Sequence, residues 1–279
     1  MTGHPQDNSR KRVTVPDVLG AKTQRRKISA LTAYDFTFAR IVDAAGVDLV
    51  LVGDTLSAVV QGHTNTLPVT LDEMIYHCRC VSRGVEHALL VGDMPFMSYQ
   101  VSPEQAVASA GRFLKEGGAG AVKLEGGVCM VEQLRRITAA DIPVMGHVGL
   151  TPQSYHRMGG HRIQGRKHGE SREAGTHERI LQDAIAVAEA GAFAIVLEGI
   201  PAELAREITA AIDIPTIGIG AGPHWDGQIL VAHDVLGLTD FRPRFVKQYL
   251  QGYELMVSAL KTYVSEVISG AFPAKDSSL

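Results

Sequence analysis

Short apolar runs that end in an acidic residue recur along the chain. The run 49–52 is followed by Gly53 and Asp54, and the same order returns at three later positions. Runs this short and rich in β-branched residues are typical of strands that are buried on both faces. A hydrophobic core does not require a carboxylate at the end of a strand, so the recurrence indicates a functional site. The four acids are Asp54, Asp93, Glu125 and Glu198.

Helix-like segments alternate with these runs. Strands are predicted at 28–33, 49–52, 88–92, 119–125, 143–147, 193–197 and 215–219. Helices are predicted at 13–22, 36–45, 71–85, 102–117, 128–139, 176–190 and 201–211, with closing helices within 244–268. An eighth strand and the helix before it are expected within 229–238. This alternation predicts an α/β fold, a (β/α)₈ TIM barrel with an N-terminal helix and C-terminal helices. A glycine-rich dinucleotide turn is absent after the first strand, which weighs against a Rossmann fold.

Three segments stand outside this alternation. Residues 1–12 and 273–279 are predicted to be disordered tails, which leaves 13–272 as a single catalytic barrel domain. The stretch 149–175 is long, basic and rich in glycine, and it has no hydrophobic period. A loop of this length inside a compact domain is usually functional or disordered.

Composition narrows the class of protein. The length of 279 residues suits one α/β barrel, and the 45% hydrophobic and 20% charged residues suit a soluble enzyme. A net charge of −3 gives no reason to expect nucleic acid or an anionic membrane as partner. No run is long enough to span a bilayer, and residues 1–12 do not resemble a signal peptide. Three cysteines form no paired framework, so a cytoplasmic location is expected. Cys78 and Cys80 lack the second pair that a structural zinc site needs.

The spacing of the charged residues suggests a metal site. Side chains alternate along a strand, so Lys123 and Glu125 point to the same side. Asp54, Asp93 and Glu125 follow successive strands, which are neighbours in a barrel. Three adjacent carboxylates raise one another's pKa unless a cation compensates them, and oxygen ligands favour Mg²⁺ over zinc. The alternative is that each acid caps the helix that follows it.

The other polar residues leave several roles open. Lys123 is interpreted as a clamp for a substrate anion, as a Schiff-base amine, or as a simple ion-pair partner of Glu125. Glu198 lies across the barrel and can act as an acid or base. His147 either polarises a carbonyl or is a hydrogen-bonded residue of the strand end. The glycine-rich stretch 218–222 either cradles a phosphate or allows tight packing.

A metal beside a lysine, with a separate base opposite, suits proton abstraction next to a carbonyl. The metal would hold a 2-oxo acid through its carboxylate and keto oxygens and would stabilise the enolate.

Several motifs, in order along the chain, resemble one enzyme family. They are Leu-Thr-Ala-Tyr-Asp at 31–35, Val-Gly-Asp at 52–54, Gln-Gly-His at 61–63, Thr-Leu-Pro-Val-Thr at 66–70, Val-Lys-Leu-Glu-Gly-Gly at 122–127, Gly-His-Val-Gly-Leu-Thr-Pro-Gln at 146–153 and Gly-Ile-Gly-Ala-Gly at 218–222. From about residue 13 to 272 the chain resembles the 3-methyl-2-oxobutanoate hydroxymethyltransferase (ketopantoate hydroxymethyltransferase) family.

The resemblance implies a Mg²⁺-dependent barrel enzyme of pantothenate and coenzyme A biosynthesis. It would transfer a one-carbon unit from 5,10-methylenetetrahydrofolate to 3-methyl-2-oxobutanoate and form 2-dehydropantoate. Members of the family form large homo-oligomers, often decamers. Thr55 stands where the family often has serine, and threonine keeps the hydroxyl donor. By position, the metal ligands would be Asp54, Asp93 and Glu125, the keto-acid contacts Asp54, Thr55, Asp93 and Lys123, and the proton acceptor Glu198.

Three alternatives remain. A Mg²⁺-dependent 2-oxo-acid lyase or mutase on a similar barrel would use the same acidic strand ends without folate. A Schiff-base aldolase would use Lys123, although an adjacent metal would then be redundant. A non-catalytic protein would bind the keto acid without turnover.

Overall fold

In the part of the chain that the structure describes, eight parallel strands close into a barrel. The computed structural model describes residues 10–160, 162–166 and 176–274. Each strand pairs with the next in chain order, and β8 pairs with β1. The strands are β1 (Ile28–Thr32), β2 (Leu49–Val52), β3 (Leu89–Asp93), β4 (Ala121–Lys123), β5 (Val144–Gly149), β6 (Ala194–Glu198), β7 (Thr216–Ile219) and β8 (Gly227–Leu230). The predicted (β/α)₈ barrel is confirmed.

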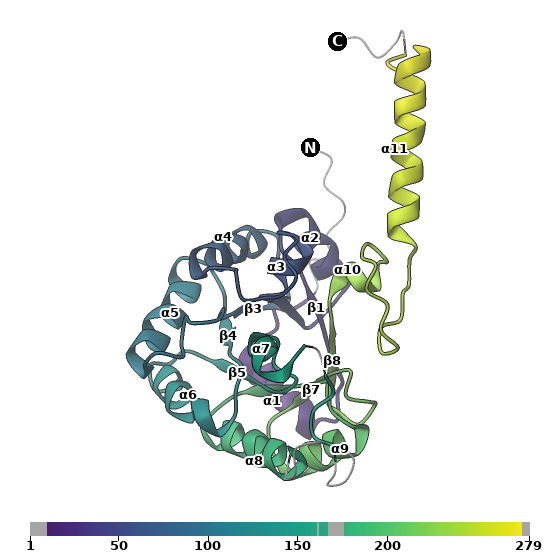
Figure 1. Ribbon diagram of the computed structural model, residues 1–279. Helices are drawn as coiled ribbons and strands as arrows, with labels where there is room; N and C mark the ends of the chain where they lie inside the picture. The colour runs from purple at the N-terminus through teal and green to yellow at the C-terminus, as the bar shows by residue number, and fades with distance from the viewer. Residues whose placement is uncertain (1–9, 161, 167–175, 275–279) are drawn as a thin grey trace. The chain divides into compact units, whose positions relative to one another are not determined.

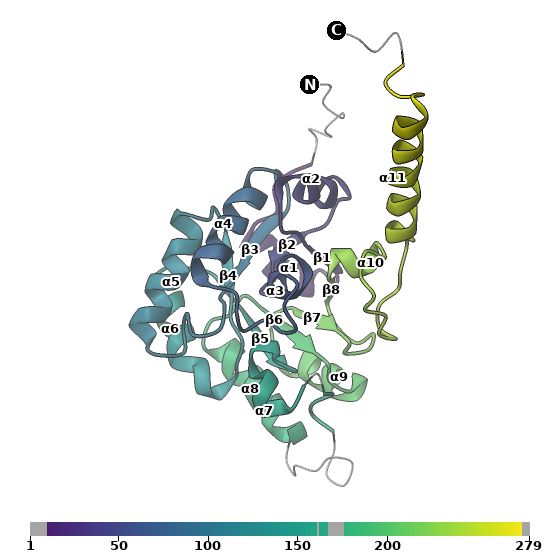
Figure 2. The ribbon, with the colours of Figure 1, turned by 45° about the horizontal axis from the view of Figure 1, so that its top comes forward.

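Helices surround the strands, as Figures 1 and 2 show. The predicted start of α4 is confirmed, because Thr70 and Glu73 form the reciprocal side-chain and backbone hydrogen bonds of a capping box. The longer helices are α2 (Phe36–Ala44), α4 (Leu71–Ser82), α5 (Pro103–Lys115), α6 (Val131–Thr138), α8 (Thr176–Glu189) and α9 (Ala202–Ala211). Shorter segments in the loops are α3 (Leu56–Val59), η1 (Val128–Met130), η2 (Pro152–Ser154) and α7 (Tyr155–Met158).

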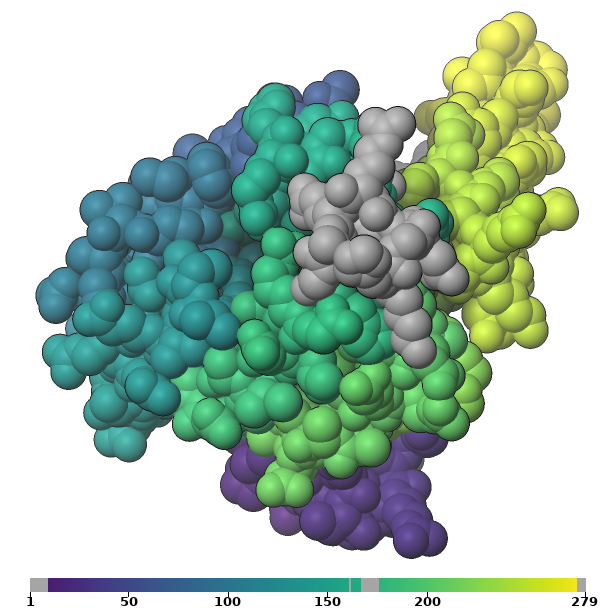
Figure 3. All heavy atoms as spheres, turned by 60° about the horizontal axis from the view of Figure 1, so that its bottom comes forward, coloured from purple at the N-terminus to yellow at the C-terminus, as the bar shows by residue number. Residues whose placement is uncertain are grey.

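Helix α1 (Val15–Thr23) packs against the amino-terminal ends of the strands. Its residues Val18 and Ala21 are fully buried and belong to the same core cluster as Ile28, the first residue of β1. Lys22 Nζ donates a hydrogen bond of 2.7 Å to the carbonyl oxygen of Thr209 in α9. Figure 3 shows the purple N-terminal segment beneath the green segment that contains α9. This helix covers one end of the barrel, so a site can form at the opposite end, where the strands finish.

Alternation along the strands decides which side chains face the inside of the barrel. Val91 of β3 and Ala121 of β4 belong to the inner core cluster. Counting on by two residues brings Asp93, and then Lys123 and Glu125, to the same side. Asp93 and Lys123 are also register partners in the sheet. The inner face of the barrel therefore changes from apolar to charged at the carboxyl ends of neighbouring strands.

The predicted order of elements within 229–238 is wrong. β8 begins at Gly227, ahead of that region, and α10 (Ala232–Val235) follows the strand instead of preceding it. Among the described residues, no helix separates β7 from β8. The connection is tight: a Cβ atom at Gly218 would lie 2.5 Å from Cδ1 of Trp225. Close packing is therefore a sufficient reason for glycine at this point of the 218–222 stretch.

The chain divides into two compact units, Met1–Leu230 and Val231–Leu279. The barrel strands lie in the first unit, and the second contains α10 and α11 (Gly252–Ser269). The single domain at 13–272 stays a prediction. The predicted tails, 1–12 and 273–279, fall largely outside the described residues, as do residues 161 and 167–175 of the 149–175 loop. No described helix has the length and apolar character needed to cross a membrane.

Candidate active site

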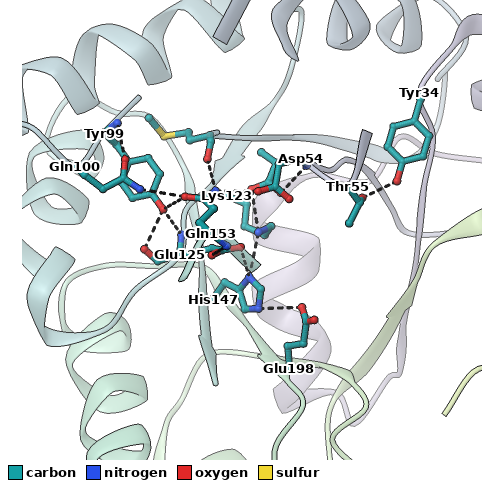
Figure 4. Close-up of polar contacts among 12 residues, drawn as sticks. Tyr34, Asp54, Thr55, Tyr99, Gln100, Lys123, Glu125, His147, Gln153 and Glu198 are labelled. Atoms are coloured by element: carbon teal, nitrogen blue, oxygen red, sulfur yellow. Dashed lines mark hydrogen bonds and ion pairs between the residues drawn. The ribbon is translucent and has the colours of Figure 1, made fainter. Parts of the chain in front are cut away.

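The predicted site residues lie together at the carboxyl ends of the strands, as Figure 4 shows for most of them. Asp54 follows β2, Asp93 ends β3, Lys123 ends β4, and Glu125 lies two residues further on. All four are buried, with at most 5% of each residue exposed. Glu198 ends β6 on the other side of the barrel, and its side chain is 20% exposed. The predicted grouping of these residues is therefore seen in the structure, whereas their individual roles stay predictions.

A row of polar contacts crosses the barrel from Asp93 to Glu198. Lys123 Nζ lies 2.9 Å from Oδ1 of Asp93 and 3.1 Å from Nδ1 of His147. The other ring nitrogen of His147, Nε2, lies 3.2 Å from Oε2 of Glu198, an ion-pair distance without aligned hydrogen-bond geometry. The contacts come from β3, β4, β5 and β6, so four successive strands build this row.

The contacts of His147 define its tautomer. A lysine ammonium has only donors, so Nδ1 of His147 must accept the hydrogen bond from Lys123. Burial and the neighbouring Lys123 charge hold the pKa of His147 well below its usual value, which keeps the ring neutral. A neutral ring that accepts at Nδ1 carries its proton on Nε2, and this proton faces Glu198.

Burial perturbs the carboxyl groups strongly. Burial, reinforced by the Asp93 charge, raises the pKa of Asp54 to about 7. Burial and the Asp54 charge raise the pKa of Glu125 well above its usual value. Burial acts to lower the pKa of Lys123, but the three surrounding carboxylates outweigh it, and the net shift is upward. The site therefore holds one firmly protonated lysine among more acidic groups than a single cation can compensate.

Each of the three clustered acids has one oxygen held by a hydrogen bond. The backbone N–H of Asp54 donates to Oδ2 of Asp93 at 3.0 Å. Nε2 of Gln153 donates to Oδ2 of Asp54, and the backbone N–H of Gln153 donates to Oε2 of Glu125, both at 3.0 Å. Oε1 of Glu125 is buried and has no hydrogen-bond partner among the described residues. These bonds come from other strands and loops, which disagrees with the alternative in which the acids cap the next helix.

The donor set is compatible with a hard divalent cation. Within residues 10–160, 162–166 and 176–274, no three His, Cys, Asp or Glu side chains converge closely enough to form a complete metal site by themselves. Mg²⁺ is commonly held by one or two carboxylates, with waters and substrate oxygens completing its coordination. The backbone N–H of Asp54 contacts Oδ2 of Asp93, and Oε1 of Glu125, which has no hydrogen-bond partner among the described residues, lies 3.5 Å from Nδ1 of His147. Oxygen ligands and excess negative charge both suit such an ion.

Thr55 is held by a hydrogen bond at the edge of this group. Its Oγ1 lies 2.7 Å from the hydroxyl of Tyr34, which is buried behind β1. The hydroxyl that the sequence predicts as a substrate contact is thus oriented by a neighbouring strand.

Two residues of the site were not among the sequence candidates. Gln153 appeared only inside the motif at 146–153, and Tyr99 carried no signal at all. The Tyr99 hydroxyl donates to Oε1 of Gln153 at 2.7 Å and accepts from the backbone N–H of Glu125 at 3.1 Å. Both residues are buried. Their roles depend on contacts with residues that are far away in the sequence, and no local pattern reveals such contacts.

Comparison with known proteins identifies the family. The family model described as ketopantoate hydroxymethyltransferase matches residues 12–275. The chain belongs to the ketopantoate hydroxymethyltransferase family. It is 58% identical, over 96% of its length and 98% of the relative's, to 3-methyl-2-oxobutanoate hydroxymethyltransferase of Pelobacter propionicus. It is 56% identical, over 96% of its length and 99% of the relative's, to the protein of the same name from Trichlorobacter lovleyi.

Two solved structures with this fold are more distant in sequence. A crystal structure of phosphonopyruvate hydrolase complexed with oxalate and Mg²⁺ has a TM-score of 0.61 at 13% identity, over 96% of this chain and 92% of that one. A crystal structure of 2,3-dimethylmalate lyase, a member of the PEP mutase/isocitrate lyase superfamily, has a TM-score of 0.57 at 18% identity, over 95% and 91%. At these identities the likeness shows the fold alone. The chain is thus a hydroxymethyltransferase-family enzyme on a TIM barrel.

Proposed function

We propose that the chain is a hydroxymethyltransferase that joins the one-carbon unit of 5,10-methylenetetrahydrofolate and the elements of water to 3-methyl-2-oxobutanoate. The products are 2-dehydropantoate and tetrahydrofolate, and the reaction is a step of pantothenate and coenzyme A biosynthesis. The observation that carries the proposal is full-length similarity to enzymes of that name, at 58% and 56% identity. The buried group of Asp54, Asp93, Lys123 and Glu125 supports it, because Lys123 together with a divalent cation held by the three acids would bind the negative oxygens of a 2-oxo acid away from water.

The proposed cofactor is Mg²⁺, with Asp54, Asp93 and Glu125 as its protein ligands. Bound there, the ion would supply Lewis acidity that makes the proton next to the keto group easier to remove. The phosphonopyruvate hydrolase structure with oxalate and Mg²⁺ supports this choice, since oxalate and a 2-oxo acid both present adjacent oxygens.

The chain's own residues would bind the keto acid and move its proton. Lys123 would pair with the substrate's negative charge, and the Thr55 hydroxyl, oriented by Tyr34, would donate to it. Glu198 would accept the proton from C3, which leaves that carbon free to form the new bond to the one-carbon unit. The neutral His147 presents its Nε2 proton to Glu198 and would hold that carboxylate in place.

A pocket beside the site is large enough for a second, larger substrate. It has a volume of about 670 Å³ and borders Glu125 and Gln153. Apolar side chains such as Met130 share its walls with the cations Arg157 and Arg179. Volumes of this size suit ligands larger than a five-carbon keto acid. Folate combines aromatic rings with carboxylates, and we propose that it uses this pocket.

The remaining proposals concern partners and location. We propose a homo-oligomer, with the decamer that the family resemblance implies, and α11 supports association because it exposes large apolar side chains along its length. Examples are Leu255, Met256, Leu260, Tyr263 and Ile268. Light scattering behind size exclusion should give a multiple of 29.9 kDa, and a monomer would refute it. The three cysteines are free thiols, which supports a reducing cytoplasm. No nucleic acid or membrane is proposed as a partner.

The deciding experiment is an activity assay. Purified protein with Mg²⁺, 3-methyl-2-oxobutanoate and methylenetetrahydrofolate should form 2-dehydropantoate, and absence of product refutes the proposal. Folate-independent cleavage of a 2-oxo-acid precursor would favour the lyase alternative. Binding of the keto acid without turnover would favour the non-catalytic binder, and trapping of a Lys123 adduct by borohydride would favour the aldolase.

A further inference from the structure

Gln153 uses the full hydrogen-bonding capacity of its side-chain amide inside the barrel mouth. It lies in η2, in the loop after β5, and is 7% exposed. Its Nε2 donates to Oδ2 of Asp54 at 3.0 Å and to the carbonyl oxygen of Met94 at 2.9 Å. Its Oε1 accepts from the hydroxyl of Tyr99 at 2.7 Å and from Nε2 of Gln100 at 3.0 Å.

These partners permit only one orientation of the amide. The carbonyl oxygen of Met94 can only accept, and so can the ionised Asp54 carboxylate that a cation needs, so neither could donate to an oxygen placed there. The amide of Gln100 faces the opposite end as a donor, and the Tyr99 hydroxyl completes that side. Reversing the amide would set acceptor against acceptor at Asp54 and Met94. Gln153 is therefore a fixed donor aimed at Asp54.

The same residue also holds the second acid, through its backbone. The N–H of Gln153 donates to Oε2 of Glu125 at 3.0 Å. One residue thus fixes one oxygen on each of two carboxylates that come from different strands. The other oxygen of Glu125, Oε1, is buried and has no hydrogen-bond partner among the described residues. Gln153 thereby holds Oδ2 of Asp54 and Oε2 of Glu125 in place, whereas Oε1 of Glu125 lies 3.5 Å from Nδ1 of His147.

We propose that Gln153 is a positioning residue of the cation site, which orients Asp54 and Glu125 for a divalent ion before the keto acid binds. The inference rests on the proposed function only in taking these acids as metal ligands. Residues that hold metal ligands by hydrogen bonds commonly change metal affinity by about 10- to 100-fold when they are replaced. A substitution at Gln153 removes the side-chain hydrogen bond to Asp54, whereas the backbone hydrogen bond to Glu125 remains.

The test is Mn²⁺ binding to the purified full-length chain in the absence of substrates, measured by the electron paramagnetic resonance signal of free Mn²⁺. Gln153→Met keeps the length of the side chain but removes the donor to Asp54, and it should weaken Mn²⁺ binding by about tenfold or more. Gln153→Glu keeps the acceptors for Tyr99 and Gln100, and it should lose Mn²⁺ affinity to a similar extent. The second variant decides the matter if the first does not fold.

Thr151→Val is the matched control. Thr151 is equally buried in the same loop and donates to Oγ of Ser154 at 2.9 Å. Among the described residues, its side chain makes no hydrogen bond or ion pair with an acid of the site. If Gln153 only anchors the loop, both substitutions should lower the thermal midpoint and the Mn²⁺ affinity alike. The proposal expects Thr151→Val to keep Mn²⁺ affinity within about threefold of the wild type.

The outcomes separate this inference from the proposed function. Wild-type Mn²⁺ affinity in both Gln153 variants, or an equal loss in Thr151→Val, overturns the positioning role and leaves the proposed reaction standing. Wild-type protein that binds Mn²⁺ but forms no 2-dehydropantoate overturns the proposed reaction, while weaker binding in the Gln153 variants still supports the positioning role.

Discussion

Metal-free protein should lose stability as the pH rises from about 5 to 7, because folding buries Asp54 in a place that disfavours its charge. The pKa of Asp54 is raised from 3.8 to about 7 by burial and by the Asp93 charge. Between these two values the unfolded chain releases the proton and the folded protein keeps it. The folded state then binds more protons than the unfolded state, so the free energy of unfolding falls as the pH rises.

The magnitude follows from the width of that interval. At ~1.4 kcal/mol per pH unit, the whole interval corresponds to about 4 kcal/mol, of which about 2 kcal/mol falls between pH 5 and 7. Glu125, whose pKa is also raised by burial, acts in the same direction. The lowered pKa of His147 acts in the opposite direction up to about 6.5, because the unfolded chain is protonated there and the folded protein is not, and Asp54 and Glu125 together outweigh this one group. A bound divalent cation needs the ionised carboxylates, so its stabilising effect should grow as the pH rises through about 7.

Urea denaturation at fixed protein concentration, with EDTA or with excess Mg²⁺, measures both effects. Asp54→Asn is the control, because it keeps the shape of the side chain and removes its titration. This variant should show a weaker decline with pH and little stabilisation by Mg²⁺. A metal-free wild type whose stability is flat or rising over this interval, or an Asp54→Asn protein that Mg²⁺ stabilises as strongly as the wild type, would refute the reasoning.

Three further substitutions test other parts of the site and the barrel. Glu198→Gln should slow exchange of the C3 proton of 3-methyl-2-oxobutanoate by at least about 100-fold and leave Mn²⁺ affinity unchanged. If NMR shows that this proton exchanges at the wild-type rate, Glu198 is not the base. Lys123→Met should weaken keto-acid binding by about 100-fold, because the negative charge of the substrate would then be repelled by the site carboxylates. A change of less than about threefold in the dissociation constant, measured by calorimetry, would contradict this. Gly92→Ala should lower the free energy of unfolding by about 2 kcal/mol, because the new Cβ would lie 2.4 Å from Cδ1 of Phe113. A urea midpoint equal to that of the wild type would show instead that Phe113 can move aside.

Local periodicity accounts for much of what could be predicted. Strand β4 is an example: alternation alone places Lys123 and Glu125 on one side, and the structure buries both there. Likewise, the start of α4 was predicted at residue 71, and the capping box that forms there is encoded within four consecutive residues. Such features depend on neighbours in sequence, so a single chain is enough to reveal them.

Features set by remote contacts could not be predicted in this way. A helix was expected between β7 and β8, because the (β/α) repeat usually has one. The structure has a short link there instead, and it packs tightly against Gly218. Gln153 lies 99 residues from Asp54 in sequence and has no period or charge that marks it. A glutamine at the end of a motif becomes a candidate only when its partners are known.

Asp35 and Asp54 show why a carboxylate after a strand is an incomplete signal. Both follow an apolar strand and precede a helix. Asp35 is exposed and accepts a 2.8 Å hydrogen bond from the backbone N–H of Phe38, so it caps α2. Asp54 is buried and accepts from Gln153 on a distant loop. Capping needs only the next turn of the chain, whereas a raised pKa needs remote segments that exclude water. Burial by other strands, and not the position of an acid after a strand, therefore separates Asp54 from the cap Asp35 in this barrel.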